Sequence, residues 1–151
     1  MVAADLPAVA AIEKGAFSPW SQASIGEELQ RDDAVALVIC RGLVVVGWGC
    51  CRHNNFAAEL LKISVSSSLR RRGLGSMLLE TFFDICRQRT VGEMFLEVRS
   101  LNHGARSFYL CHGFTEVGRR ISYYRQPPDD ALVLKKIMNR HRKGQENEEY
   151  S

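Results

Sequence analysis

The sequence predicts a single α/β domain in which helices cover both faces of a β-sheet. Its 151 residues, of which 46% are apolar, suit one domain with one core. Two neighbouring runs, 34–40 and 43–51, are apolar on both strand faces, so we expect helices on each side of the sheet. A third run, 60–65, alternates as a strand does and is followed by a turn and then by apolar residues at helical spacing.

The predicted elements follow one another along the chain with short connections. Helices are expected from Asp5, from Ser21 or Ser24, over 73–89 and over 102–112, and strands over 34–40, 43–51, 60–65, 94–98, 114–120 and 132–137. Asp5 is a suitable N-cap, and Pro7 is tolerated in a first helical turn. Arg41 and Gly42 indicate a hairpin between the first two strands, and Gly113 is typical of the left-handed residue that ends a helix.

Two segments stand outside these elements. Between the first two helices, Phe17 and Trp20 are expected to be core aromatics, and the lining of a substrate groove is the alternative. From residue 139 onward the chain is polar and charged, without an apolar period. We therefore expect one domain over 1–138 and a flexible charged tail over 139–151.

Composition narrows the classes of protein. The net charge of +3 favours an anionic ligand over general nucleic-acid binding. There is no run of 18 apolar residues and no signal-peptide pattern, so we expect a cytoplasmic protein without a membrane span. The five cysteines have no C-x-x-C or zinc spacing and are expected to be small core residues in a reducing compartment. The four histidines lack ligand spacing as well, and no metal is expected.

The strand over 60–65 leads into a loop that suits an anion. The loop consists of Arg70, Arg71, Arg72, Gly73, Leu74 and Gly75, and a helix follows it directly. This arrangement aims free backbone N–H groups and the positive helix end at one point, and the arginines add charge for phosphates. A P-loop would have Lys-Ser/Thr after its second glycine, but Gly75 is followed by Ser76 and Met77. A dinucleotide-binding fingerprint would have a third glycine where this chain has Leu78. The loop therefore fits neither a P-loop nor a dinucleotide site.

Several motifs in a fixed order carry a resemblance to a known family. They are Arg70-x-x-Gly73-x-Gly75, Leu96-Glu97-Val98-Arg99-x-x-Asn102, Ala105 with Phe108-Tyr109, Gly113-Phe114, Arg119-Arg120, Tyr123-Tyr124, Asp130-Ala131 and, upstream, Ala16 to Ser21. Together they make the chain, from about Asp5 to Met138, resemble the GNAT superfamily, the Gcn5-related N-acetyltransferases that use acetyl-CoA. Within it, the chain is most similar to the ribosomal-protein alanine N-acetyltransferases and other N-terminal protein acetyltransferases.

This resemblance implies a fold and a cofactor site. The fold is a mixed, mostly antiparallel sheet with one splayed parallel strand pair and helices on both faces. Acetyl-CoA, the co-substrate, would bind along Ile63, Ser64 and Val65, whose free backbone groups can pair with pantetheine and polarise the thioester carbonyl. The arginine- and glycine-containing loop would hold the pyrophosphate. Asn102 would bond the pantetheine chain, and a plain helix cap is the alternative role for it.

The same resemblance implies two catalytic residues and direct transfer in a ternary complex. Glu97 is an acid inside an apolar strand, a position that is either edge-exposed or functional. It would be the general base that removes a proton from the incoming amine. Tyr109 lies seven residues, or two helical turns, after Asn102 and would donate a proton to the leaving thiolate. A buried packing tyrosine with a satisfied hydroxyl is the alternative for Tyr109.

Tyr123 and Tyr124 resemble the residues that bind the backbone of an acceptor peptide. Their spacing departs from the family, which has one residue between the arginine and tyrosine pairs, where this chain has Ile121 and Ser122. An α-amine, with a pKa of about 7.7–8.0, is easier to deprotonate than a lysine at about 10.4. The expected activity is therefore acetylation of a protein N-terminus that begins with Ala or Ser, such as that of a ribosomal protein.

Two other functions remain open at this point. A GNAT enzyme could instead acetylate a lysine side chain or a small-molecule amine. A non-catalytic CoA- or RNA-binding module is the second alternative, and the presence of both Glu97 and Tyr109 disfavours it. We expect no direct nucleic-acid partner and no membrane partner, and either a monomer or a weak homodimer.

Overall fold

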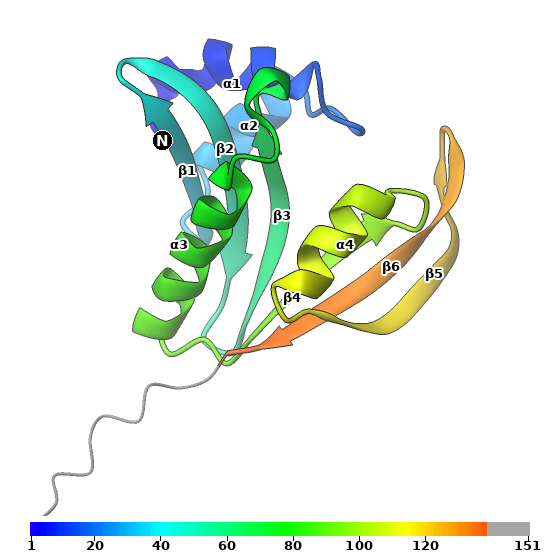
Figure 1. Ribbon diagram of the computed structural model, residues 1–151. Coiled ribbons are helices and arrows are strands. Elements are labelled where there is room, and N and C mark those ends of the chain that lie inside the picture. Colours follow the sequence, from blue (N-terminus) through cyan, green and yellow to red (C-terminus); the bar gives the residue numbers. More distant parts are fainter. Residues whose placement is uncertain (139–151) are drawn as a thin grey trace, which may run out of the picture.

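The chain folds into one six-stranded sheet with helices on both faces (Figure 1). The structure, a computed structural model, describes residues 1–138, and the predicted tail, 139–151, lies outside the described residues. The helices are the short 3-10 turns η1 (Ala3–Asp5) and η2 (Ser67–Leu69) and the α-helices α1 (Leu6–Glu13), α2 (Gln22–Leu29), α3 (Leu74–Gln88) and α4 (His103–Cys111). The strands are β1 (Ala34–Arg41), β2 (Val44–His53), β3 (Ala57–Val65), β4 (Glu93–Arg99), β5 (Thr115–Arg125) and β6 (Pro128–Ile137).

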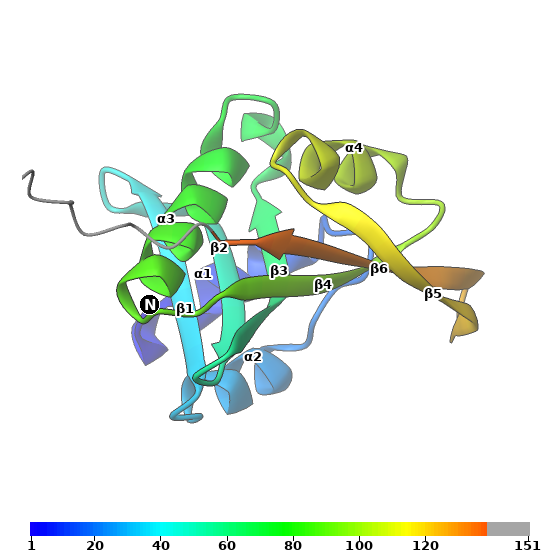
Figure 2. The same cartoon turned by 90° about the horizontal axis from the view of Figure 1, so that it is seen from below.

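The sheet has the strand order β1-β2-β3-β4-β6-β5. Among the described strands, β3 and β4 form a parallel pair and all other neighbours are antiparallel. Figure 2 shows α1 and α2 on the opposite side of the sheet from α3 and α4. The predicted mixed, mostly antiparallel sheet with helices on both faces is confirmed.

The parallel pair is splayed, which opens a gap in the middle of the sheet. Pairing between β3 and β4 ends at Glu59 opposite Phe95, so residues 60–65 of β3 leave β4 behind (Figure 1). A bulge lies in β3 at the same place, because Leu60 and Lys62 pair with consecutive residues of β2. Bulges bend a strand and increase its twist, so this one helps β3 to turn away from β4.

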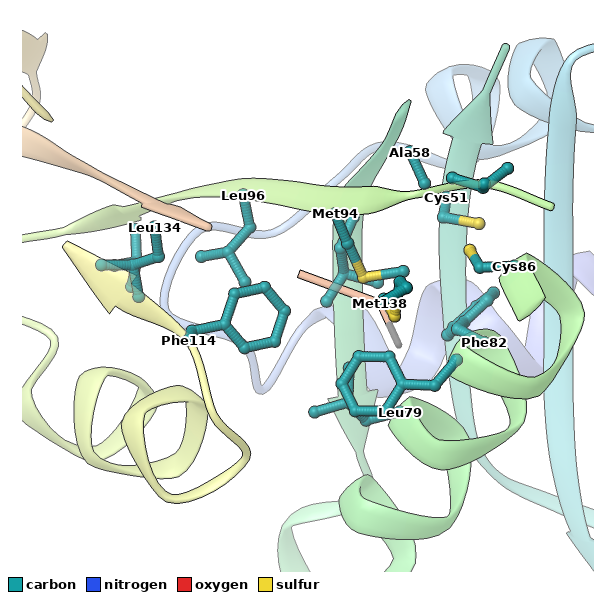
Figure 3. Close-up of a cluster of buried hydrophobic side chains, with 14 of the residues drawn as sticks. Cys51, Ala58, Leu79, Phe82, Cys86, Met94, Leu96, Phe114, Leu134 and Met138 are labelled. Carbon is teal, nitrogen blue, oxygen red and sulfur yellow. The ribbon is translucent and has the colours of Figure 1, made fainter. Parts of the chain in front are cut away.

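Each face of the sheet has its own core. The core toward α3 includes Leu79, Phe82, Cys86, Met94, Leu96 and Phe114 (Figure 3). The core toward α1 and α2 is formed by Val9, Ile25, Trp48 and Cys50. Leu96 and Val98 of β4 belong to the first core, and side chains alternate along a strand. Glu97 and Arg99 are therefore turned toward the face that carries α1 and α2.

Helix ends follow local chemistry, with one correction. Ser21 caps α2, since its Oγ accepts a hydrogen bond from the Ser24 N–H at 3.1 Å. Gly113 ends α4 with a φ of +88°, as predicted. The expected cap of α1 by Asp5 is wrong in detail. Asp5 occupies the cap position, but its carboxylate accepts from the N–H of Val2 at 2.8 Å, which draws the side chain away from the helix.

Strands β5 and β6 extend beyond the predicted ranges 114–120 and 132–137. Strand β5 continues to Arg125 and strand β6 already starts at Pro128, so only a tight turn separates them. Most side chains of β5 are exposed, so this end of the hairpin rests on backbone pairing with β6 and not on apolar burial. Its sequence accordingly lacks the apolar alternation by which strands are recognised.

Candidate functional site

The gap beside β3 exposes a row of backbone groups. Ile63, Ser64 and Val65 pair with β2 on one edge only, opposite Gly49, Trp48 and Gly47. Backbone groups alternate between the two edges of a strand, and Ser66 N–H donates to Val46 O, so Ser64 pairs with β2 while the N–H and C=O groups of Ile63 and Val65 face the edge that β4 has left. Backbone groups of this kind can pair with an extended chain that enters the gap. The pantetheine arm of CoA, which carries amide groups, is such a chain.

The loop after β3 places a helix end at the mouth of this gap. Arg71 and Gly73 have positive φ values, +61° and +81°, and Gly73 is the N-cap residue of α3. The first helical hydrogen bond runs from Met77 N–H to Gly73 O at 3.0 Å. The N–H groups of the turn between those two residues have no partner inside the helix, and such groups bind anions. This geometry fits a pyrophosphate.

The three arginines of the loop differ in what they do. Arg70 donates from Nη2 to the carbonyl of Gly15 at 2.7 Å and from Nε to that of Val65 at 3.4 Å. It therefore joins the loop to the segment after α1. Arg71 and Arg72 are exposed at the rim of the loop, where their charges can meet phosphates.

Asn102 and Tyr109 lie on α4, which flanks the gap. Asn102 is the N-cap residue of α4, and its Oδ1 accepts from the Ala105 N–H at 3.2 Å, so the cap role holds. The Tyr109 ring packs edge-on against Phe108 and Phe114, with centroids 5.1 and 5.6 Å away. Burial raises the pKa of Tyr109 above its ordinary 10.0, and no hydrogen bond within residues 1–138 offsets that burial. The hydroxyl is thus a protonated donor without a partner in this part of the chain.

Glu97 lies just beyond the point where β3 and β4 separate, on the opposite sheet face from Tyr109. Its Oε1 is 2.9 Å from Nε of Arg120, and its side chain keeps 23% of its exposure. A cavity of about 520 Å³ opens beside it, and Phe95 and Arg120 also line this cavity. A partly exposed carboxylate at the edge of a cavity can accept a proton from a ligand that enters there.

Tyr123 and Tyr124 gather at this same face. Their rings lie 5.1 Å apart, and the guanidinium carbon of Arg120 lies 5.4 Å from the Tyr123 ring. Burial, and then the charge of Glu97, raises the pKa of Tyr124. The structure therefore brings Glu97 and both tyrosines together.

The extra residue before the two tyrosines is absorbed by an irregularity in β5. Arg120 and Tyr124 pair with Ala131 and Asp129 of β6, so three residues of β5 face one residue of β6. Ser122 takes a φ of +50° there, and its N–H donates to Oδ1 of Asp130 at 2.7 Å. The bulge lets both tyrosine rings approach each other although the residues are neighbours in a strand.

A buried polar cluster on the sheet face that carries α1 and α2 was not predicted from the sequence. Glu13, which is fully buried, accepts from Nε1 of Trp48 and from the N–H of Trp20, both at 2.8 Å. Nζ of Lys62 lies 3.2 Å from the same carboxylate and donates to the carbonyl of Ser18 at 2.7 Å. The signal was present, since Glu13 interrupts the apolar stripe of the first helix and Lys62 interrupts an apolar strand.

The expectations for core aromatics and cysteines hold only in part. Trp20 packs against Trp48 in the core below α1 and α2, but Phe17 is 58% exposed and its core assignment is wrong. Three cysteines are buried, whereas Cys40 and Cys111 are exposed. Cys40 lies near the end of the edge strand β1 and Cys111 in the last turn of α4, and both side chains face solvent there. All five thiols are free.

Residues 1–138 contain neither a group of metal ligands nor a helix that could span a membrane. Within residues 1–138, no three His, Cys, Asp or Glu side chains are grouped so that they could hold a metal ion. No helix over the same residues is both long enough and apolar enough to cross a membrane.

Comparison with known proteins identifies the family. Residues 6–114 match the acetyltransferase (GNAT) family. The chain belongs to the GNAT family. It is thus an acetyl-CoA-dependent N-acetyltransferase, which confirms the predicted family and enzyme class. The six-stranded mixed sheet with its splayed parallel pair is the GNAT fold in this chain.

Three relatives place this GNAT enzyme more closely. It is 34% identical over 142 residues to the [ribosomal protein bS18]-alanine N-acetyltransferase of Salmonella typhimurium, covering 86% of this chain and 89% of the relative. It is 32% identical over 122 residues to N-alpha-acetyltransferase RimI of Mycobacterium tuberculosis, covering 78% and 75%. The crystal structure of the ribosomal-protein-S18-alanine N-acetyltransferase from Escherichia coli superposes with a TM-score of 0.85 at 27% identity, covering 99% and 96%.

Proposed function

We propose that this enzyme transfers the acetyl group of acetyl-CoA to the N-terminal α-amine of a protein that begins with Ala or Ser. The observation that carries the proposal is the placement of the candidate residues on two opposite faces of the sheet. Glu97 and the pair Tyr123 and Tyr124 lie on one face of the sheet, where a peptide can approach. Tyr109 and the start of α3 lie on the other face, where CoA can bind.

The cofactor site rests on this chain's own groups. Ile63 and Val65, on either side of Ser64, turn backbone groups toward the pantetheine arm, and the 70–75 loop offers the start of α3 and exposed arginines to the pyrophosphate. Asn102 stands at the start of α4 beside the gap and adds a side-chain amide. Acetyl-CoA supplies the acetyl group in activated form, as a thioester.

Two proton movements accompany the transfer. Glu97 takes a proton from the acceptor amine, directly or through a water molecule, so that the amine nitrogen can form the new amide bond. As the carbon–sulfur bond breaks, Tyr109 gives its proton to the departing thiolate and recovers one from solvent. Burial keeps Tyr109 protonated at neutral pH, which is the state that this role requires. No covalent acetyl-enzyme is needed.

The choice of an α-amine rests on chemistry and on the relatives. An α-amine has a substantial neutral fraction at pH 7, so one carboxylate, itself paired with Arg120, suffices as its base. Tyr123 and Tyr124 carry hydroxyl groups that can bind the backbone at the start of a peptide. The Salmonella and Escherichia coli relatives are named for acetylating an N-terminal alanine of a ribosomal protein. A ribosomal protein is accordingly the acceptor that we propose first.

A comparison of two peptides tests this proposal. One peptide begins with a free alanine and contains no lysine, and the other has a blocked N-terminus and several internal lysines. Each is incubated with the protein and acetyl-CoA, and the products are identified by mass spectrometry. Acetylation of the first peptide alone is the expected result. Acetylation of the second, or of neither while acetyl-CoA binds, would contradict the proposed acceptor.

A further inference from the structure

Arg99 has no part in the chemistry proposed above, yet its guanidinium makes three hydrogen bonds and lies over two aromatic rings. It is the last residue of β4 and lies on the same face as Glu97. Its Nε donates to Oγ of Ser18 at 3.0 Å. Its Nη1 and Nη2 donate to the carbonyls of Pro127 and Gln126 at 2.9 and 3.1 Å. All three nitrogens of the guanidinium are therefore used.

The guanidinium is also covered by aromatic rings. Its central carbon lies 4.0 Å from the centroid of the Tyr124 ring and 5.6 Å from that of Phe17. A planar guanidinium can stack on a ring and donate in its own plane at the same time, which a lysine ammonium cannot do. The position thus uses the properties that distinguish arginine from lysine.

These contacts join two segments that are far apart in the sequence. The first is the acceptor loop, residues 14–21 between α1 and α2, which contributes Ser18 and Phe17. The second is the hairpin tip, residues 126–127 between β5 and β6. The acceptor loop has a further anchor, because Lys62 of β3 donates to the carbonyl of Ser18 at 2.7 Å. Lys62 fixes the loop to the sheet, and Arg99 fixes it to the hairpin tip.

We infer that Arg99 is a positioning residue that sets the separation of the acceptor loop and the hairpin tip. This inference rests on the proposed function, in which a peptide reaches Glu97 and Tyr124, and extends the peptide site to these two segments. A peptide that contacts both segments is held well only while the distance between them is fixed. The cofactor-binding loop also contacts the acceptor loop, because Arg70 donates to the carbonyl of Gly15 at 2.7 Å, but that contact does not involve Arg99.

Hydrogen–deuterium exchange tests the bridge without any substrate. In Arg99→Gln, amides of residues 14–21 and 121–127 should exchange faster than in the wild type, while α3 should stay protected. Arg87→Gln is the matched control, since Arg87 pairs with Asp84 on α3, which lies on the opposite face of the sheet from α1 and α2. Unchanged exchange in both segments of Arg99→Gln would show that Arg99 does not join them.

Steady-state kinetics test what the bridge does. Arg99→Gln should raise KM for the α-amine peptide by about tenfold or more, the effect of losing about one charge-assisted hydrogen bond. KM for acetyl-CoA should stay near the wild-type value, as should both constants in Arg87→Gln. Arg99→Lys should not restore the peptide KM, because one ammonium cannot reach three separate acceptors. Full rescue by lysine would mean that the charge alone matters, against the inference.

A double-mutant cycle isolates the contact to the acceptor loop. Ser18→Ala removes the acceptor of Arg99 Nε but leaves the carbonyl that Lys62 binds. It should raise the peptide KM in the wild type and have no added effect in Arg99→Gln. Independent, additive effects would contradict the bridge. A wild-type protein that fails on α-amine peptides would refute the proposed function, and the exchange experiment would still decide whether Arg99 joins the two segments.

Discussion

Replacing Glu13 by alanine tests the polar cluster that holds the acceptor loop. Glu13 is fully buried and accepts from three donors, the Trp48 indole, the Trp20 N–H and the Lys62 ammonium. Without it, the buried Trp48 N–H loses its acceptor, which costs about 1–3 kcal/mol. Lys62, with 13% of its side chain exposed, also loses its carboxylate, and breaking a buried ion pair costs about 3–5 kcal/mol in all.

We therefore expect Glu13→Ala to lower the free energy of unfolding by about 3–5 kcal/mol in a urea titration. For a chain of this size that corresponds to a fall in Tm of about 10 °C or more. Glu93→Ala is the matched control, because Glu93 forms a surface ion pair with Lys135 at 2.9 Å, and such pairs contribute about 0–1 kcal/mol.

Glu13→Gln separates charge from shape. It keeps the size of the side chain and one acceptor oxygen, but it turns an amide N–H₂ toward a donor. Its free energy of unfolding should therefore fall by more than that of Glu93→Ala and by less than that of Glu13→Ala. If Glu13→Ala and Glu93→Ala destabilise equally, the buried carboxylate does not hold the loop as described.

Three further outcomes follow from the site. Tyr109→Phe should lower kcat by about 10²-fold or more while the ring packing and the fold persist. Because the pKa of Tyr109 is raised, its proton stays in place, and kcat of the wild type should not fall through Tyr109 ionisation below about pH 10. Gly73→Ala should raise KM for acetyl-CoA with little change in the peptide KM, since a φ of +81° strains any residue with a Cβ. Equal increases in both KM values would contradict the assignment of this loop to the cofactor. In a thiol titration of the native protein, Cys40 and Cys111 should react quickly, and Cys50, Cys51 and Cys86 only on unfolding, because burial raises their pKa, to about 12 for Cys50 and Cys51, and removes the thiolate.

Much of the fold follows from local sequence. Ser21 and Gly113 mark the ends of their helices through contacts within a few residues. The apolar runs over 34–40 and 43–51 predict two strands, of which β2 is buried along most of its length and the edge strand β1 only in part. The splay of the parallel pair followed from the family resemblance. The β3 bulge at Leu61 that accompanies it depends on register against β2, which no local pattern contains.

The site divides in the same way. Glu97 and Tyr109 were predicted from motifs, but alternation along β4 was needed to see that they occupy opposite faces. Arg99 was part of a quoted motif without a role, because its partner Ser18 is 81 residues away in the sequence. Glu13 and Trp48, 35 residues apart, escaped for the same reason. In the sequence, a polar contact between distant segments is visible only as an isolated charged residue within an apolar segment.

The turnover of Glu97→Gln on the free-alanine peptide tests the central claim most directly. The glutamine keeps the size of the side chain and a hydrogen-bonding group for Arg120 but cannot take a proton at neutral pH. We expect kcat to fall by about 10²- to 10⁴-fold, with acetyl-CoA binding by calorimetry unchanged. Turnover within a few-fold of the wild type would contradict the assignment of Glu97 as the base that activates the acceptor amine.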